Sequence, residues 1–267
     1  MIRFPAVAGR FYPSDPKDLS RQIDSFAVPG AVGESALGCV VPHAGYMYSG
    51  HVAGAVYSAL QIPPQCILLG PRHFPRGAAM AILTEGSWQM PFGPAQIDSP
   101  VAAEVARACP HLREDPVAHQ HEHSLEVQLP FLQHWAPGFR FVPIVLGTDR
   151  YPLLEDLGRA LAQVIRARKE KVLLIASSDM NHYESDALTR AKDHRAVEKI
   201  LALDPRGLYD TVRFEGITMC GYAATVAMLV AARELGAKVA RLIKYATSGD
   251  INGDRQEVVG YAGITIA

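Results

Sequence analysis

Continuous apolar runs separated by segments of helical periodicity set out the framework of this chain. Four runs lack the polar alternation of a half-exposed strand, which is typical of strands buried on both faces of a sheet. They are residues 36–41, 66–69, 141–146 and 172–176. Helices are expected at residues 50–60, 101–108, 153–168, 187–203 and 223–235. This alternation predicts an α/β fold, with a central, mostly parallel sheet and helices on both faces.

The composition is that of a folded enzyme-sized domain. The chain has 267 residues, of which 49% are hydrophobic, and no long linker, repeat or low-complexity block divides it. A single domain over residues 1–267 is therefore expected. The four cysteines show no CxxC spacing. Cys39 and Cys66 lie in apolar runs, so they are expected to be buried thiols and not parts of a disulfide framework.

Charge and hydropathy exclude some classes of partner. The formal net charge is -1 and no stretch concentrates lysine or arginine, so no electrostatic footprint for DNA or RNA is present. No apolar segment approaches the roughly 20 residues that a membrane span needs, and the N-terminus lacks the pattern of a signal peptide. A cytoplasmic protein without a membrane or nucleic-acid partner is expected.

Chemically reactive side chains follow the predicted strands. His43 comes after the first run, His73 after the second, Asp179 after the fourth, and the segment 147–149 after the third. Ligands of open α/β sheets bind beyond the carboxyl ends of the strands, so these residues are expected on one rim. Together with Cys220, the two histidines form a set that suits iron(II), zinc or copper and leaves coordination positions open. Open positions indicate chemistry on a small substrate or O2.

The segment His119-Gln120-His121-Glu122-His123 is rich in histidine and has two interpretations. On a strand, its three histidines would share one face and form a metal tract. Alternatively, Ser124 caps a following helix, which leaves His119 and His121 in a loop as metal-binding or merely surface residues. In that case Glu122 and His123 are candidates to support the metal site or bind substrate.

Further candidates surround the predicted rim. His182 is a candidate general base, because the ordinary pKa of histidine lies near neutral pH. Asp179 could orient the His182 ring, bind the metal weakly, or cap the next turn. Tyr46 could donate a hydrogen bond to a substrate or simply pack its ring. Cys220 is expected at a helix start, where the helix dipole favours the thiolate; without a metal it could be a reactive thiol.

Ordered motifs along the whole chain resemble those of the Memo family, whose microbial members are called AmmeMemoRadiSam system protein B. They are Pro5-Ala6-Val7-Ala8-Gly9-Arg10-Phe11-Tyr12-Pro13, Pro42-His43-Ala44-Gly45-Tyr46, Leu69-Gly70-Pro71-Arg72-His73, Glu122-His123-Ser124-Leu125-Glu126, Ser177-Ser178-Asp179 with His182, Cys220-Gly221 and Tyr245-Ala246-Thr247-Ser248-Gly249-Asp250. That family is similar in fold to the class III extradiol ring-cleaving dioxygenases. The resemblance implies a non-haem iron pocket in which His43, His73 and Cys220 are the ligands, lined by Asp179, His182 and His123.

Cys220 stands where those dioxygenases have a glutamate, and this departure bears on the reaction. A thiolate is softer than a carboxylate and is itself open to oxidation. The function expected is an iron(II)-dependent, dioxygenase-like redox enzyme, with zinc or copper as alternative metals. A zinc hydrolase and a non-catalytic module that binds a peptide or protein are the alternatives. The resemblance also implies work beside a radical-SAM protein and an AMMECR-like protein.

Overall fold

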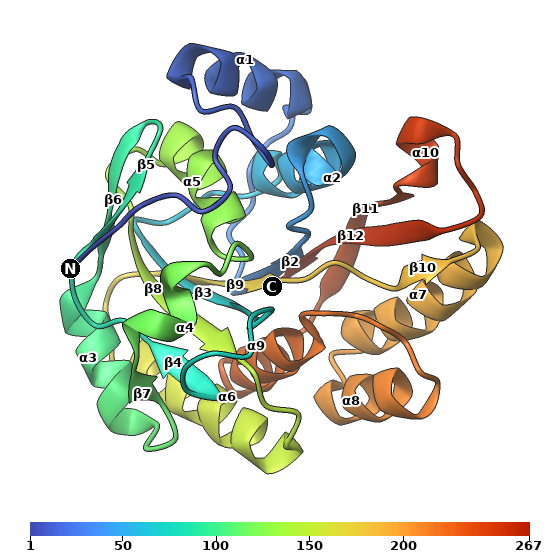
Figure 1. The fold of residues 1–267 in the computed structure, drawn as a ribbon. Helices are drawn as coiled ribbons and strands as arrows, with labels where there is room; N and C mark the ends of the chain where they lie inside the picture. The colour runs from blue at the N-terminus through green and yellow to red at the C-terminus, as the bar shows by residue number, and fades with distance from the viewer.

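A mixed sheet of 12 strands runs through the computed structural model, which describes all residues, 1–267 (Figure 1). Its main path is β1-β5-β6-β8-β3-β9-β2-β12-β10, while β11 pairs with β12 and β4 pairs with β7 and β8. The strands are β1 Ile2–Arg3, β2 Gly38–Val41, β3 Gln65–Pro71, β4 Met80–Ile82, β5 Ser87–Met90, β6 Gly93–Ile97, β7 Arg113–Glu114, β8 Arg140–Leu146, β9 Val172–Ser177, β10 His182–Glu184, β11 Ala240–Thr247 and β12 Val258–Ile266.

The four apolar runs form the centre of this sheet. Four strands lie side by side and are parallel, in the order β8, β3, β9 and β2. Strand β12 pairs with β2 and is antiparallel to it. Every residue of β2 and β9 is buried. Because both faces of these strands are covered, their sequences are apolar without alternation, as predicted.

Helices cover both faces of the sheet. In Figure 1, α1, α2 and α5 lie on one side and α3, α6, α7, α8 and α9 on the other. The helices are α1 Pro16–Phe26, α2 Tyr46–Ser58, α3 Ser99–Ala108, α4 Pro116–Gln120, α5 Leu129–Trp135, α6 Tyr151–Arg166, α7 Asp186–Leu201, α8 Pro205–Phe214, α9 Tyr222–Glu234 and α10 Gly249–Asn252, with a 3-10 turn η1 at Glu126–Gln128. The predicted α/β class is confirmed, and each predicted helix is present with shifted ends. No helix is both long enough and apolar enough to cross a bilayer.

The parallel strands β2, β3 and β9 all end at the same edge of the sheet, at Val41, Pro71 and Ser177. The loops that follow them therefore meet. A Cβ on Gly70 would lie 2.5 Å from the Ser124 hydroxyl oxygen, so the absence of a side chain there lets the histidine-rich loop lie against the end of β3.

Candidate metal centre

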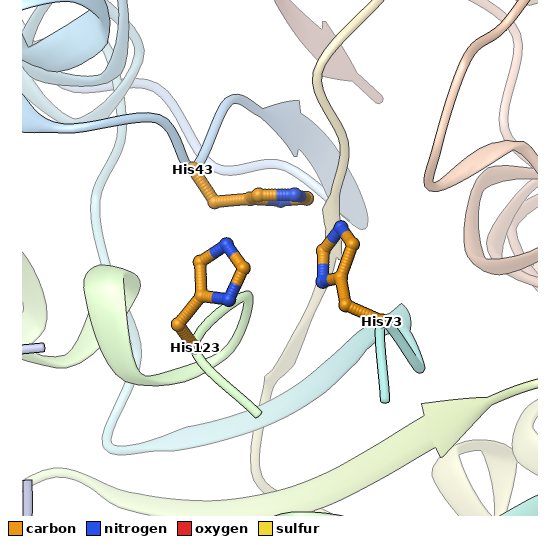
Figure 2. Close-up of side chains that lie close together, drawn as sticks. All are labelled: His43, His73 and His123. Atoms are coloured by element: carbon orange, nitrogen blue, oxygen red, sulfur yellow. The ribbon is translucent and has the colours of Figure 1, made fainter. Parts of the chain in front are cut away.

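Three imidazole rings meet beyond the ends of β2 and β3 (Figure 2). One nitrogen from each of His43, His73 and His123 lies within 4.8 Å of the corresponding nitrogens of the other two. The rings of His73 and His123 are stacked, with centroids 4.6 Å apart, and His43 lies edge-on to both. The structure thus brings the two predicted ligand histidines together and adds His123, which the sequence placed in a supporting role.

Hydrogen bonds fix which nitrogen of His43 faces the cluster. Its Nδ1 lies 2.9 Å from the Ser177 hydroxyl oxygen. That hydroxyl donates its one proton to the Ser124 carbonyl at 2.7 Å and accepts from the Gln128 amide at 2.9 Å. Ser177 must therefore accept from His43 Nδ1–H, so the lone pair of the neutral ring is on Nε2. Burial, and then the neighbouring His73, lower the pKa of His43, which keeps this ring neutral.

Glu122 holds the second and third rings. Its carboxylate accepts from the backbone N–H of His73 at 2.6 Å, of His123 at 2.9 Å and of Ser124 at 2.8 Å. It also accepts from His73 Nδ1 at 2.8 Å, so the remaining nitrogen of that ring points to the cluster. Burial alone would raise the pKa of Glu122, but these hydrogen bonds outweigh it and lower the pKa to about 2. Glu122 thus orients the His73 ring and holds the backbone that carries His123.

The pKa values of the two stacked rings, His73 and His123, shift in opposite directions. Burial lowers the pKa of His73, but the hydrogen bond to Glu122 more than compensates, so its pKa is raised. In His123 burial prevails and the pKa is lowered. His73 is the histidine that carries charge most readily in the absence of a metal.

Cys220 reaches the cluster from the far end of the chain. Its Sγ lies 3.3 Å from His43 Nε2 and also accepts from the backbone N–H of Asp179 at 3.3 Å. A Cβ on Gly221 would stand 2.2 Å from the Ser177 carbonyl oxygen, so glycine is required for this loop to approach the end of β9. Cys220 thus contacts His43 and lines the same cavity as His73, whereas the ligand atoms that all lie within 4.8 Å of one another belong to His43, His73 and His123.

The acidity expected for Cys220 is wrong for the metal-free protein. The helix α9 begins at Tyr222, with Gly221 at its N-cap, so the thiol lies before the helix and not in its first turn. Burial, followed by the charge of Asp179, raises the pKa of Cys220. Burial therefore favours the neutral thiol over the thiolate when no metal is bound.

Asp179 follows β9 and His182 begins β10, and no hydrogen bond joins their side chains. One oxygen of Asp179 accepts from the backbone N–H groups of His43 at 2.7 Å and Ala44 at 3.3 Å, so this side chain caps the turn after β2. His182 is instead oriented by Thr218, whose carbonyl lies 2.9 Å from His182 Nδ1. Since a carbonyl only accepts, the lone pair of a neutral His182 is on Nε2.

The histidine-rich tract is not a strand, and no helix capped by Ser124 follows it. His119 lies in the short helix α4, is fully buried, and donates from Nδ1 to the Asp115 carbonyl at 2.9 Å. Burial lowers its pKa to about 4. Neither the metal-tract nor the surface interpretation therefore holds for His119. Ser124 does not cap a helix, because its hydroxyl donates to the Pro71 carbonyl and a 3-10 turn follows.

A cavity of about 710 Å³ opens from the cluster. Its walls include His182, Thr218, Tyr48 and Tyr261. Tyr46 is buried instead, with its hydroxyl donating to the Val127 carbonyl at 2.8 Å, so of its two interpretations packing is the one observed. The segment 147–149 also lies away from this cavity: Asp149 pairs with Arg213 of α8 at 2.5 Å.

Sequence reasoning did not find several residues of the site. Ser177 and Gln128 set the tautomer of His43, and Thr218 sets that of His182. Arg10 and Phe11 of the N-terminal segment line the cavity. The only signal for Ser177 was its position at a strand end, and none marked Gln128, which lies inside an apolar stretch.

The fold and the site together define an α/β protein with a histidine-rich cavity at the carboxyl edge of a mostly parallel sheet. The chain belongs to the Memo family: residues 3–265 match the family described as Memo-like protein. A MEMO1 family protein of Methanopyrus kandleri is 40% identical over 99% of this chain and 98% of its own length. Another, of Pyrobaculum arsenaticum, is 41% identical over 98% of each chain.

A solved structure supports the fold at much greater sequence distance. The crystal structure of an Escherichia coli K12 protein aligns with a TM-score of 0.58 at 10% identity, and the alignment covers 85% of this chain and 98% of that one. At such low identity the likeness concerns the fold alone. The membership in the Memo family that the sequence motifs predicted is confirmed by the match over residues 3–265.

Proposed function

We propose that this protein binds one transition-metal ion at the histidine cluster and is a non-haem iron-dependent redox enzyme, dioxygenase-like, acting on a small substrate. The observation that carries the proposal is the group of three imidazole nitrogens within 4.8 Å of one another, with a thiol 3.3 Å from His43 Nε2. The outer nitrogens of His43 and His73 are already engaged by Ser177 and Glu122. Metal-binding histidines are held in this way, by hydrogen bonds from the other ring nitrogen.

The donor set fits such an ion. Metal–nitrogen bonds of about 2.1 Å and a metal–sulfur bond of about 2.3 Å at a tetrahedral angle imply a nitrogen–sulfur separation of roughly 3.6 Å. The distance from His43 Nε2 to Cys220 Sγ is 3.3 Å, close to that value. We propose His43, His73 and Cys220 as the ligands. His123 offers a further nitrogen, so a set of three histidines is the competing arrangement.

The protein's own groups would divide the remaining work. Cys220 would release its proton when the ion binds, because a coordinating thiol is deprotonated. His182 presents an Nε2 lone pair on the cavity wall and would accept a proton from substrate. Asp179 would hold the turn that carries His43. Iron(II), when bound, would supply open coordination positions for O2 and substrate.

A zinc-dependent hydrolase is the second candidate, favoured by one observation. A thiol 3.3 Å from an imidazole nitrogen is a softer donor than the carboxylate typical of non-haem iron sites, and it suits zinc or copper better than iron(II). In this alternative the same residues would hold the ion, and His182 would take a proton from an attacking water. The identity of the metal separates the two functions.

The experiment is metal analysis of protein purified without oxygen. Mass spectrometry of bound metals is compared for the wild type and for His43→Ala, His123→Ala and Cys220→Ser. The control is His111→Ala, because His111 pairs with Asp156 and does not line the cavity, and thermal unfolding checks that each variant is folded. About one iron per chain, lost in His43→Ala and Cys220→Ser, is expected; O2 consumption then becomes the next assay. One zinc per chain would favour the hydrolase. Equal metal content in folded wild type and His43→Ala would refute the site.

A further inference from the structure

The N-terminal segment presents one arginine to the cavity. A tight turn, in which Gly9 has φ 77° and Arg10 N–H donates to the Val7 carbonyl at 3.0 Å, places Arg10 and Phe11 in the cavity wall. The turn is anchored to α2, because Tyr46 N–H donates to the Phe11 carbonyl at 2.7 Å. Arg10 is exposed, and its one hydrogen bond runs from Nη2 to the Ala6 carbonyl at 2.9 Å. No carboxylate of the protein pairs with this guanidinium.

No free anion in the cavity competes for Arg10. The single carboxylate among the lining residues is Asp179, which is only 5% exposed and already accepts two backbone N–H groups. Glu122 lies behind His73 and His123 and is 1% exposed. The accessible wall thus carries a cation and several imidazoles, and this arrangement attracts an anion.

The rest of the wall is aromatic. Phe11, Tyr48, Tyr183 and Tyr261 all line the cavity. Elsewhere, buried tyrosines use their hydroxyls within the protein; that of Tyr57, for example, donates to the Gln128 side chain at 2.9 Å. No protein atom accepts a hydrogen bond from the hydroxyl of Tyr48, Tyr183 or Tyr261. These groups combine flat apolar faces with free donors, which suits a planar ring that bears polar substituents.

We propose that the cavity binds a small organic acid with a planar ring, whose carboxylate is held by Arg10. The inference deepens the proposed function and rests on it, since it names the class of substrate for the same centre. A carboxylate fits better than a phosphate, because its single negative charge matches one guanidinium, whereas a phosphate monoester carries a charge of about −1.5 to −2 at pH 7. The cavity volume of about 710 Å³ is within the range of small-molecule sites.

The test uses the full chain stripped of metal, so that no ion attracts the probe. Benzoate, cyclohexanecarboxylate, phenyl phosphate and benzylamine are titrated by NMR into the wild type, Arg10→Gln and Arg107→Gln. Arg107 is the matched control: it lies on α3 away from the cavity, is exposed, and likewise donates only to the carbonyl four residues earlier. Metal content after reloading is measured separately for each protein.

Benzoate is expected to bind the wild type and Arg107→Gln equally, and to bind Arg10→Gln about tenfold more weakly, since the charged hydrogen bonds are lost. Benzylamine should not bind. Equal benzoate affinity in wild type and Arg10→Gln would overturn the proposal. If cyclohexanecarboxylate bound as tightly as benzoate, the requirement for a planar ring would be wrong. If phenyl phosphate bound more tightly than benzoate, the preference for a carboxylate would be wrong. Failure of metal reloading in the wild type, with Arg10-dependent benzoate binding intact, would count against the metal function alone.

Discussion

Asp193 of α7 is a buried acid whose replacement by asparagine should change how the stability of this protein depends on pH. One carboxylate oxygen accepts from the Asn181 N–H at 2.8 Å and the other from the Tyr245 hydroxyl at 2.6 Å. Burial raises the pKa of Asp193 to about 7, although these hydrogen bonds and the nearby charges of His194 and Arg190 oppose the rise. The protonated form is therefore favoured in the folded state.

The size of the effect follows from proton linkage. The pKa of Asp193 rises from 3.8 in the unfolded chain to about 7 on folding, so between these pH values the folded state binds the additional proton. Its contribution to stability is full below about pH 4 and is lost as the pH rises to about 7. The pKa rise of about 3.2 units, at 1.36 kcal/mol per unit and with a unit of error allowed, gives a loss of about 3–6 kcal/mol.

Asp193→Asn removes this titration while keeping both hydrogen bonds, because the amide oxygen can accept from Asn181 and its NH2 can donate to Tyr245. Between pH 4 and pH 8 the variant should gain about 2–5 kcal/mol in the free energy of unfolding relative to wild type, because part of the loss in the wild type already occurs below pH 4. Urea denaturation at pH 4, 5, 6, 7 and 8 measures the difference. A difference that stays constant over this range would refute the reasoning.

A control at the same helix should show the opposite sign. The side-chain hydrogen bond from Arg190 lowers the pKa of Asp186 to about 2. Its contribution to stability is therefore present above the unfolded pKa and lost as the pH falls toward 2. Asp186→Asn should destabilise the protein at pH 7 and lose that effect in acid.

Two further substitutions test the supports of the site. Arg3→Met removes a fully buried partner of Glu126, 2.7 Å away, and should cost about 3–5 kcal/mol of unfolding free energy in urea denaturation, because the carboxylate stays buried without its cation. Glu122→Gln should weaken metal binding about 10- to 100-fold in a chelator competition assay, because the charge that orients and polarises His73 is lost while the shape is kept.

Each has a matched control in the same chain. Arg241→Met breaks an exposed ion pair with Glu34 and should cost less than about 1 kcal/mol. Glu114→Gln changes an exposed glutamate that accepts from the Thr84 N–H, so metal affinity should stay at the wild-type value. If Arg3→Met destabilised the protein no more than Arg241→Met, the argument from the buried ion pair would be wrong. If Glu122→Gln bound metal as tightly as Glu114→Gln, the argument that Glu122 orients His73 would be wrong.

The sequence by itself determined the framework of the fold and part of the site. The runs that became β2, β3, β8 and β9 are apolar without alternation because both faces of these strands are buried, and this property is local to each run. His43, His73 and Asp179 follow strands that prove to be parallel neighbours, so the rule that such strand ends share an edge placed them correctly.

Helix starts were less well predicted than strands. Periodicity placed the start of α2 at residue 50, whereas the helix begins at Tyr46, where the backbone N–H donates to the Phe11 carbonyl. The apolar spacing after Ser124 suggested a capped α-helix, but the Ser124 hydroxyl donates to the Pro71 carbonyl, 53 residues away, and a 3-10 turn follows. In each case a contact far outside the local window decided the outcome.

Only the tertiary structure decided which atoms meet at the centre. Glu122 orients His73 across 49 residues, Ser177 orients His43 across 134, and Cys220 meets His43 across 177. Periodicity records which face of an element is buried, but not what that face is buried against. The neutral thiol of Cys220, the tautomers of His43 and His182, and the membership of His123 in the cluster all depend on partners brought from distant segments, so the local sequence could not supply them.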